Sequence, residues 1–371
     1  MDGLRIKDAL YRIASREDDA LLRRLLRENA MPSWVTMATE REPSHFDGAS
    51  LMGDSYTLIA EEVRKRKRVI GMYACSYMPV HIDGRPETIG YFGGMRVNSG
   101  FRRKVRYIRQ GFEAVEKLLP KQSTVPFYFT SIASGNRPAR RLLEANLRGM
   151  PKYTPRGEMT TLVFSVKQGR RRGTLQQATP DDIPEIAAFY NRSASDYQLA
   201  PHLSEAWLRT LDGTVGLTVS DFWLVRDDDG ALHCSLALWD QRAFKQSVVR
   251  GYRRPLSHLR RLYNLYARLG GRVELPATGE ALEHLYIAFF AADAKKSAVM
   301  AIREAAAIAT DKGVTSCVLG LSSRHPLTAE LRRSLRASTY RTEIETVVLA
   351  GNEHEKRCFD NRIVQPEVAL L

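Results

Sequence analysis

Residues 87–119 read ETIGYFGGMRVNSGFRRKVRYIRQGFEAVEKLL, and residues 125–147 read VPFYFTSIASGNRPARRLLEANL. The first run predicts a strand over Thr88–Val97, a basic turn, and a helix over about Val105–Leu119. Large apolar residues in that helix recur at three- and four-residue steps and share one face: Val105, Ile108, Phe112, Val115 and Leu119. The second run predicts a buried strand over Val125–Ile132 and a short helix over Arg137–Ala145, capped by Ser134 or Asn136.

A strand, a crossover helix and a second strand usually form a parallel, right-handed unit. The turn after the first strand would then lie at its carboxyl end, where open α/β sheets bind ligands. The turn offers the amides of a helix start and four basic side chains: Arg102, Arg103, Lys104 and Arg106. We therefore expect a phosphate group to bind here, and a solvated helix start is the alternative.

The composition is that of a folded protein with room for two cores. The chain has 371 residues, of which 44% are hydrophobic and 26% charged. Its formal net charge is +14, and the sequence pI is about 9.7. This charge favours an anionic partner, which could be a nucleotide, a nucleic acid, an acidic substrate or a membrane surface. A basic surface without a dedicated ligand is the other interpretation.

The four cysteines are scattered, and none forms a CxxC pair or a cysteine–histidine cluster with zinc-finger spacing. We therefore expect no metal and a reduced, cytoplasmic location. Cys75, Cys234 and Cys317 lie in strand-like apolar runs, so we expect small buried hydrophobes. The chain does not begin like a signal peptide, and it contains no apolar run of the length that a transmembrane helix needs, about 18 residues.

The order of elements repeats after a polar, basic linker at residues 169–173. The second half predicts a short strand and a capped helix, a hairpin about Asp228-Asp229-Gly230, a strand over Leu285–Ala291, and a helix over Lys296–Thr310. We therefore predict an N-terminal domain over 1–168 and a C-terminal domain over 174–371. The second domain carries a basic insertion at 242–279 with an amphipathic helix over Pro255–Leu269. The insertion would contact an acidic partner, tRNA or a lipid surface, or pack across the two domains.

Three passages resemble the acyl-CoA-binding core of the GNAT acetyltransferase superfamily. Residues 94–102 (GMRVNSGFR) resemble its fourth strand and the start of its pyrophosphate loop. Residues 129–144 (FTSIASGNRPARRLLE) resemble its fifth strand and the following helix, with the pattern Asn-x-x-Ala-x-x-Leu. Residues 178–187 (ATPDDIPEIA) resemble the opening strand and helix of a second copy. The resemblance covers about 10–166 and 174–350.

The resemblance implies an α/β (α+β) fold of two tandem GNAT-like domains. Each domain would have a mixed, mostly antiparallel sheet with a central parallel strand pair and flanking helices. The first would bind acetyl-CoA or another acyl-CoA as co-substrate. The residues that the resemblance assigns to the cofactor are Met95, Val97, Phe101, Arg102, Arg103, Lys104, Val105, Arg106 and Asn136. Arg103, Val105 and Tyr107 stand where small residues are common in the family loop, so arginine side chains would take over part of the phosphate binding.

The expected reaction is direct attack of an amine on the acyl thioester, which makes the protein an N-acyltransferase, of the N-acetyl type. Glu87 is the candidate base and Tyr91 the candidate acid. Trp239 and Asp240, at a strand end of the second domain, are candidate contacts for a small-molecule or peptide amine. One alternative is a non-catalytic tandem pair that binds an anionic ligand or nucleic acid. Another is an aminoacyl-tRNA-dependent transferase of the same fold.

Overall fold

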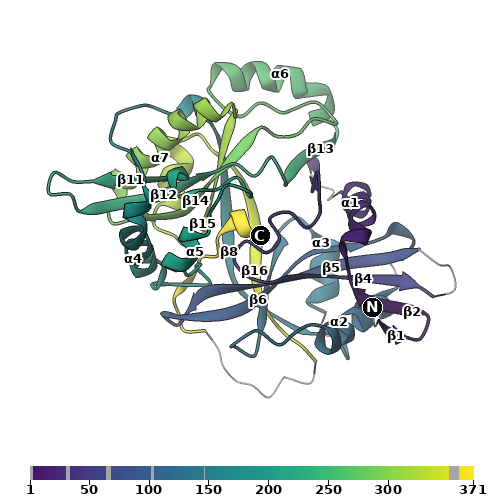
Figure 1. Ribbon diagram of the computed structural model, residues 1–371. Helices are drawn as coiled ribbons and strands as arrows, with labels where there is room; N and C mark the ends of the chain where they lie inside the picture. Colours follow the sequence, from purple (N-terminus) through teal and green to yellow (C-terminus); the bar gives the residue numbers. More distant parts are fainter. Residues whose placement is uncertain (1–2, 31–33, 64–67, 102–103, 146, 351–358) are drawn as a thin grey trace.

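The computed structural model describes residues 3–30, 34–63, 68–101, 104–145, 147–350 and 359–371. Within these ranges one mixed sheet of thirteen strands runs through the whole molecule (Figure 1). Strands of the N-terminal half make one side of it, in the spatial order β1 (Leu4–Ile6), β2 (Ala9–Ile13), β4 (Ser55–Glu62), β5 (Val69–Ile82), β6 (Arg85–Val97) and β7 (Tyr128–Ala133). Strands of the C-terminal half make the other, in the order β15 (Ser316–Ser322), β14 (His284–Ala292), β12 (Leu232–Trp239), β11 (Phe222–Arg226) and β9 (Gln176–Gln177).

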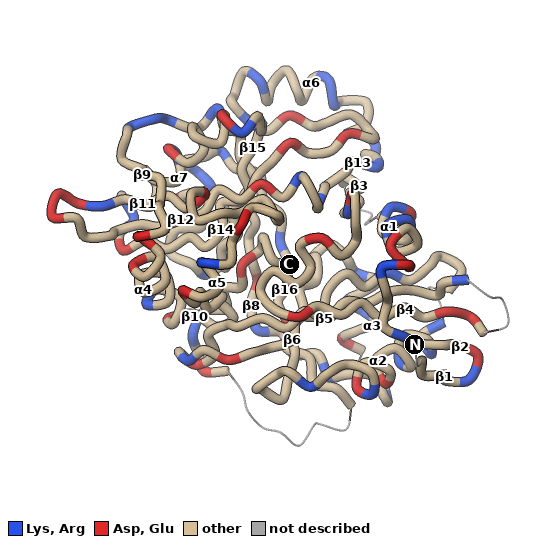
Figure 2. The backbone as a smooth tube through the Cα atoms, in the orientation of Figure 1, with Lys and Arg blue, Asp and Glu red and all other residues tan. Residues whose placement is uncertain are grey.

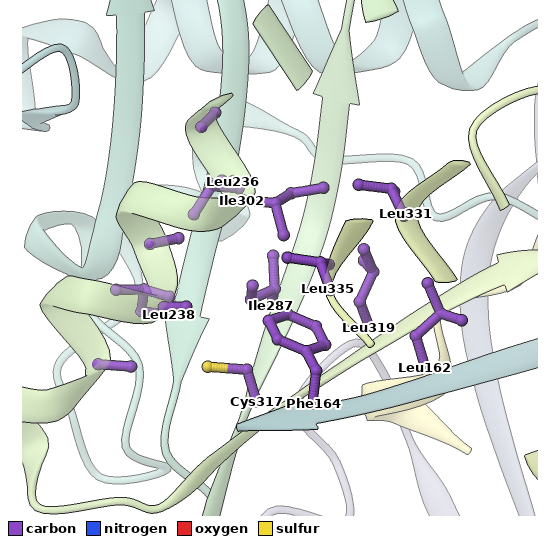
Figure 3. Packing of buried hydrophobic residues seen from close by; sticks show 14 of the residues in the cluster. Leu162, Phe164, Leu236, Leu238, Ile287, Ile302, Cys317, Leu319, Leu331 and Leu335 are labelled. Atoms are coloured by element: carbon purple, nitrogen blue, oxygen red, sulfur yellow. The ribbon is translucent and has the colours of Figure 1, made fainter. Parts of the chain in front are cut away.

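The two halves exchange one strand each at the middle of the sheet. β16 (Ser338–Val348) belongs to the C-terminal half by sequence but pairs with β7, and β8 (Lys152–Ser165) belongs to the N-terminal half but pairs with β15. β8 and β16 also pair with each other, in antiparallel fashion. Leu162 and Phe164 of β8 pack in the core of the C-terminal half, against Cys317 and Leu319 (Figure 3). Each half therefore completes the core of the other.

Both halves have the predicted central parallel strand pair. β6 runs parallel to β7, and β14 runs parallel to β15; the other pairs in the large sheet are antiparallel. The sequence-predicted strands and helices are present, with shifted ends: the strand predicted from Val125 begins at Tyr128, because Pro126 has no N–H to donate to a ladder. The prediction of fold class is confirmed.

Helices cover both faces of the sheet in each half. In the N-terminal half, α2 (Val105–Leu118) and α3 (Arg137–Leu143) contribute to the core on one face, and α1 (Asp19–Glu28) packs on the other. In the C-terminal half, α7 (Lys295–Ala309) and α8 (Thr328–Ser334) cover one face, and α4 (Ile183–Ala194) and α5 (Glu205–Arg209) cover the other. Cys75, Cys234 and Cys317 are buried free thiols, as predicted, and Cys358 lies outside the described residues.

Two small sheets lie beside the large one, and the first of them ties the halves together. β3 (Val35–Glu40) pairs with β13 (Gln246–Tyr252) of the insertion, and β10 (Tyr197–Gln198) pairs with β17 (Ile363–Val364) near the end of the chain. The linker is also fixed, because the buried carboxylate of Glu304 accepts hydrogen bonds from the main-chain N–H groups of residues 172–175. The insertion carries its predicted helix, α6 (Leu256–Leu269), at the periphery (Figure 1). No helix in the described part of the chain is both long enough and apolar enough to span a membrane.

Candidate functional site

The central parallel pair of the N-terminal half opens toward its carboxyl end. β6 and β7 are in register only at Tyr91 with Phe129 and at Phe92 with Thr130. The hydroxyl of Thr130 donates to the main-chain oxygen of Phe92 at 2.7 Å and closes the ladder there. Beyond Phe92, β6 carries a bulge opposite β5, and Gly94 adopts a φ of +62°. Gly94 is exposed, so a ligand can approach its main chain closely.

The bulge is repeated in the C-terminal half. The register of β12 against β14 shifts in the same way as that of β5 against β6, so Phe289 takes the place of Gly94. Phe289 has a φ of +49°, which is strained for a bulky residue. The two halves therefore share the same backbone bulge, as a repeat would. The residue with positive φ is Gly94 in the first half and Phe289 in the second.

The opening beyond the second bulge is filled by the chain itself. The Glu367 carboxylate accepts from the N–H of Phe289 at 2.8 Å and from the N–H of Ala369 at 3.0 Å. Val368 packs directly on Gly320 of β15, in the space that a Cβ would need. The ammonium of Lys245 donates to the main-chain oxygens of Ala369 and Leu371, at 3.4 and 2.9 Å. Burial raises the pKa of Glu367 and lowers that of Lys245, each to about 7.

Tyr91 lies at the start of the opening in the N-terminal half. Its ring packs on Phe129 at 4.9 Å between centroids, and its hydroxyl lies 2.8 Å from that of Ser131. Burial raises the pKa of Tyr91, while the hydrogen bond to Ser131 opposes this shift. Partial burial raises the pKa of Tyr340 of β16, and the nearby guanidinium of Arg96 of β6 opposes this shift.

Sequence reasoning missed Ser131, Arg96 and Tyr340. Ser131 and Arg96 stand in the quoted stretch, but nothing in a linear pattern distinguishes them from other strand residues. Tyr340 comes to the site only through the exchange of β16, almost 250 residues after Tyr91 in the sequence. No sequence signal available to us would have placed it there.

The basic residues of the predicted phosphate loop differ in whether the structure describes them and in whether they are already paired with an acid. Arg102 and Arg103 lie outside the described residues. Arg106 is already paired, because its guanidinium donates to Asp8 at 2.7 Å and to the hydroxyl of Tyr107 at 2.9 Å. Hydrogen bonding from Tyr107, with Arg106 nearby, lowers the pKa of Asp8.

Lys104 is exposed at the start of α2, and its ammonium lies 5.0 Å from the ring centre of Phe101. Phe101 is buried beneath it, and the guanidinium of Arg68 lies over the same ring, 4.8 Å from its centre. Arg68, which directly precedes β5, is a further basic residue beside this loop. It was not among the residues that the sequence pattern assigned to the phosphate site. Val105 begins α2, so the free N–H groups of the helix start face the same region.

Met95 and Val97 line an apolar cavity of about 60 Å³ beneath α2, with Ile70, Ile108 and Gly111 among its other walls. Asn136 caps α3, since its side-chain oxygen accepts from the N–H of Ala139 at 3.4 Å. This is the structural role considered for Asn136, and its contact with a cofactor stays a prediction.

Glu87 accepts a hydrogen bond from the hydroxyl of Thr124 at 2.6 Å, near the amino end of β6. Tyr91 lies four residue steps further along the strand, which corresponds to roughly 13 Å. The structure therefore does not bring the candidate base and the candidate acid together. A proton passing from an amine near Tyr91 to Glu87 would need intervening water.

The two substrate candidates of the C-terminal half lie in different surroundings. Trp239 is 2% exposed, and its indole N–H donates to the main-chain oxygen of Val215 at 2.7 Å. Asp240 pairs with Arg242 at 2.8 Å and lines an open cavity of about 370 Å³ with Glu283 and Gln246. Their contact with a substrate stays a prediction, which the cavity supports for Asp240 alone.

One group of carboxylates could be considered for a metal. Oxygens of Glu144, Glu343 and Glu345 lie within 4.8 Å of one another beneath α3. Arg140 already binds two of them, Glu144 at 2.8 Å and Glu343 at 2.9 Å. Glu345 is fully buried and accepts no hydrogen bond within the described part of the chain. Burial, with Glu144 and Glu343 close by, raises its pKa to about 7. Protonation of Glu345 would reduce the negative charge of this cluster.

The sequence matches no protein-family model and no curated protein. The structure is similar to that of N-myristoyltransferase from Saccharomyces cerevisiae with bound myristoyl-CoA. That similarity has a TM-score of 0.61 at 8% identity and covers 97% of this chain and 89% of the other. A GCN5-related N-acetyltransferase from Anabaena variabilis matches with a TM-score of 0.51 at 12% identity, over 92% of this chain and 72% of that one. The fold is therefore of the GNAT type, and the tandem arrangement is consistent with the fold of N-myristoyltransferase.

Proposed function

We propose that this protein is an acyl-CoA-dependent N-acyltransferase with a single cofactor site, in the N-terminal half. One observation carries the proposal: the two halves share a bulge at equivalent positions, and among the residues that the structure describes only the second has its opening filled by the chain. At Phe289 the bulge N–H holds a carboxylate oxygen of Glu367. The equivalent N–H in the N-terminal half belongs to Gly94, which is exposed. A thioester carbonyl oxygen has the acceptor character that this position requires.

The remaining parts of the cofactor would follow the strand and the loop. The pantetheine arm would pair with the main chain of Gly93–Met95, beyond the last rung shared with β7. The pyrophosphate would bind at the start of α2, where Lys104 and Arg68 supply positive charge beside the helix N–H groups. Arg102 and Arg103 remain candidates for the same contact, whereas Arg106 would have to leave Asp8 to join them.

In the proposed reaction the nitrogen of a neutral amine attacks the thioester carbonyl carbon. A C–N bond forms, the C–S bond breaks, and the thiolate receives a proton from Tyr91, whose hydroxyl is held by Ser131. The proton lost by the amine passes through water toward Glu87. The acceptor would be a small molecule or a peptide.

Acyl-chain length is the finer question. The expectation that the transferred group is acetyl rests on the resemblance to GNAT acetyltransferases, whereas the similar yeast structure holds myristoyl-CoA. The apolar cavity beside Met95 and Val97 offers a longer acyl chain a place to begin. We retain acetyl-CoA as the first co-substrate to test and a longer acyl-CoA as the second.

Calorimetric titration of the full chain with acetyl-CoA, octanoyl-CoA and myristoyl-CoA tests the proposal. We expect saturable binding of one molecule per chain and a loss of affinity in Lys104→Glu, with Lys121→Glu as the matched control outside the loop. Release of free CoA is then measured with a panel of amines. An absence of binding to all three thioesters would remove the basis of the proposal, and two bound molecules per chain would contradict the single site.

A further inference from the structure

Helix α6 stands at the periphery of the molecule and is held there by one side only. On the side of α6 that faces the protein, Ala267 is buried, and the side chains of Asn264 and Arg260 hydrogen-bond to the segment that follows the helix. Asn264 exchanges hydrogen bonds with the main chain of Leu275, at 2.9 and 2.8 Å, and Arg260 donates to the same carbonyl at 3.1 Å. Arg260 and Asn264 thus face the protein.

Most of the large apolar side chains of α6 face solvent, which departs from the usual pattern of a surface helix. Eight large hydrophobic side chains are exposed in the described part of the chain, and five of them lie on this one helix: Leu259, Leu262, Leu265, Tyr266 and Leu269. Leu269 is 82% exposed and Leu262 66%. A sixth, Trp34, lies beside the helix start, because its carbonyl accepts from the N–H of Arg253 at 3.0 Å. The insertion packs across the two halves through β13, which pairs with β3, whereas this apolar face of α6 is left exposed.

Positive charge surrounds this apolar face. Figure 2 shows Lys and Arg at both ends of α6. Residues 242–273 contain no acidic residue, and Arg253, Arg254 and Arg261 are exposed. Only Arg268, among the arginines along the described helix, has an ion pair, with Glu274 at 2.9 Å. An exposed leucine stripe flanked by arginines is the pattern of helices that lie in the interface of an anionic bilayer.

We propose that α6 docks this protein onto an anionic lipid surface, with Leu262, Leu265 and Leu269 entering the acyl boundary and Arg253, Arg254 and Arg261 contacting lipid phosphates. The observations favour a bilayer over the other occupants. An RNA backbone would satisfy the arginines but leave the leucines in water. A second copy related by a two-fold axis would bury the leucines but bring arginines of like charge together. The proposal is independent of acyl transfer.

Flotation of the full chain with vesicles tests it, using phosphatidylcholine alone and phosphatidylcholine mixed with phosphatidylglycerol. We expect binding to the anionic vesicles that weakens with salt. The double variant Leu262→Glu/Leu265→Glu should reduce partitioning by at least about tenfold, because charged side chains disfavour the acyl boundary. Arg261→Glu should also reduce it. The matched controls are Leu147→Glu, at another exposed leucine, and Arg209→Glu, at an exposed arginine on α5; both should bind as the unaltered chain does.

Leu262 and Leu265 are exposed, so the variants should fold; thermal melting checks this, and Leu262→Ser/Leu265→Ser repeats the test without added charge. Three results would overturn the proposal. The first is an absence of binding to anionic vesicles, or binding that the double variant leaves intact. The second is salt-dependent binding to RNA that Arg261→Glu abolishes and the leucine variants do not, with no vesicle binding. The third is self-association in sedimentation that the leucine variants abolish, again with no vesicle binding.

Discussion

The Glu367 carboxylate accepts a hydrogen bond from the main-chain N–H of Phe289 at 2.8 Å, at the bulge where β14 begins to leave β15. The same carboxylate accepts from the N–H of Ala369, so it holds the last described turn of the chain, Val368–Leu370, in the opening. One carboxylate thereby links a strained backbone position to the segment that fills the space beside it. This relationship distinguishes the two halves of the protein, and it can be broken by substitution.

Replacing Glu367 by alanine removes both hydrogen bonds and leaves the strained Phe289 without its partner. We expect a loss of about 1–3 kcal/mol in the free energy of unfolding. The amide of Phe289 should also exchange faster with deuterium, and both effects can be followed on the same sample. An unchanged exchange rate at Phe289 would show that the chain end does not hold the second opening.

Gly94→Ala places a Cβ on the bulge that the cofactor is proposed to approach. Only Ala74 lies within contact of that Cβ, at 3.8 Å, so the substitution strains the backbone without a clash. We expect a loss of stability of about 1 kcal/mol and a rise of about tenfold in the acyl-CoA Kd. Gly230→Ala is the control, since Gly230 also has a positive φ, of +83°, and nothing near its Cβ. It should lose similar stability and keep its affinity, and equal affinities in the two variants would argue against the bulge as the cofactor site.

Tyr91→Phe and Ser131→Ala both remove the hydrogen bond between the Tyr91 and Ser131 hydroxyls. Each substitution deletes a different one of the two hydroxyls. If Tyr91 protonates the leaving thiolate, Tyr91→Phe should lower kcat by about 10²-fold or more, because general acid catalysis contributes at least this much. Ser131→Ala keeps the Tyr91 hydroxyl and should lower kcat far less. Steady-state kinetics on both variants separates the roles, and equal losses would reduce Tyr91 to a positioning role.

Glu345→Gln should change how stability depends on pH. Burial raises the pKa of Glu345 to about 7 in the folded protein, above its value of 4.5 in an unfolded chain. Between these values the folded state binds the extra proton, so the stability contributed by the protonated form is lost as pH rises through about 7. The glutamine variant does not lose this stability as pH rises, and it should be about 3 kcal/mol more stable than the unaltered chain at pH 8. At pH 4, below both pKa values, the two proteins should unfold at nearly the same urea concentration, and a constant difference at both pH values would refute the assignment.

The substitution of glycine by alanine should have opposite effects at two positions. In α2, a Cβ at Gly111 meets only the ring of Tyr11, at 3.8 Å, so Gly111→Ala should stabilise the helix by about 0.5–1 kcal/mol. In β15, a Cβ at Gly320 would overlap Val368, so Gly320→Ala should cost about 1–3 kcal/mol. Thermal melting compares the two, and stabilisation at Gly320 would mean that Val368 is not packed there.

The quoted stretch allowed much of the fold to be predicted, because periodicity, helix caps and turn residues act over neighbours in the chain. The helix from Val105 and the cap at Asn136 are where the pattern placed them. The site was predicted less completely. Phe101 and Lys104 lie together at the start of α2, but Arg106 is committed to Asp8, which is almost 100 residues away in the sequence. A linear pattern records that an arginine is present and not which carboxylate neutralises it.

The sequence by itself determined the elements, their order, and the repetition of that order, since these follow from local propensity and the spacing of apolar residues. Only the tertiary structure decided that β8 and β16 change places, that Glu367 and Val368 fill the opening of the second half, and that four leucines of α6 face solvent. Each of these depends on contacts between residues far apart in the chain, whose free energies are set by what packs beside them. The sequence pattern of an amphipathic helix is the same whether its apolar side packs on a core or faces water. Which of the two occurs depends on the rest of the chain.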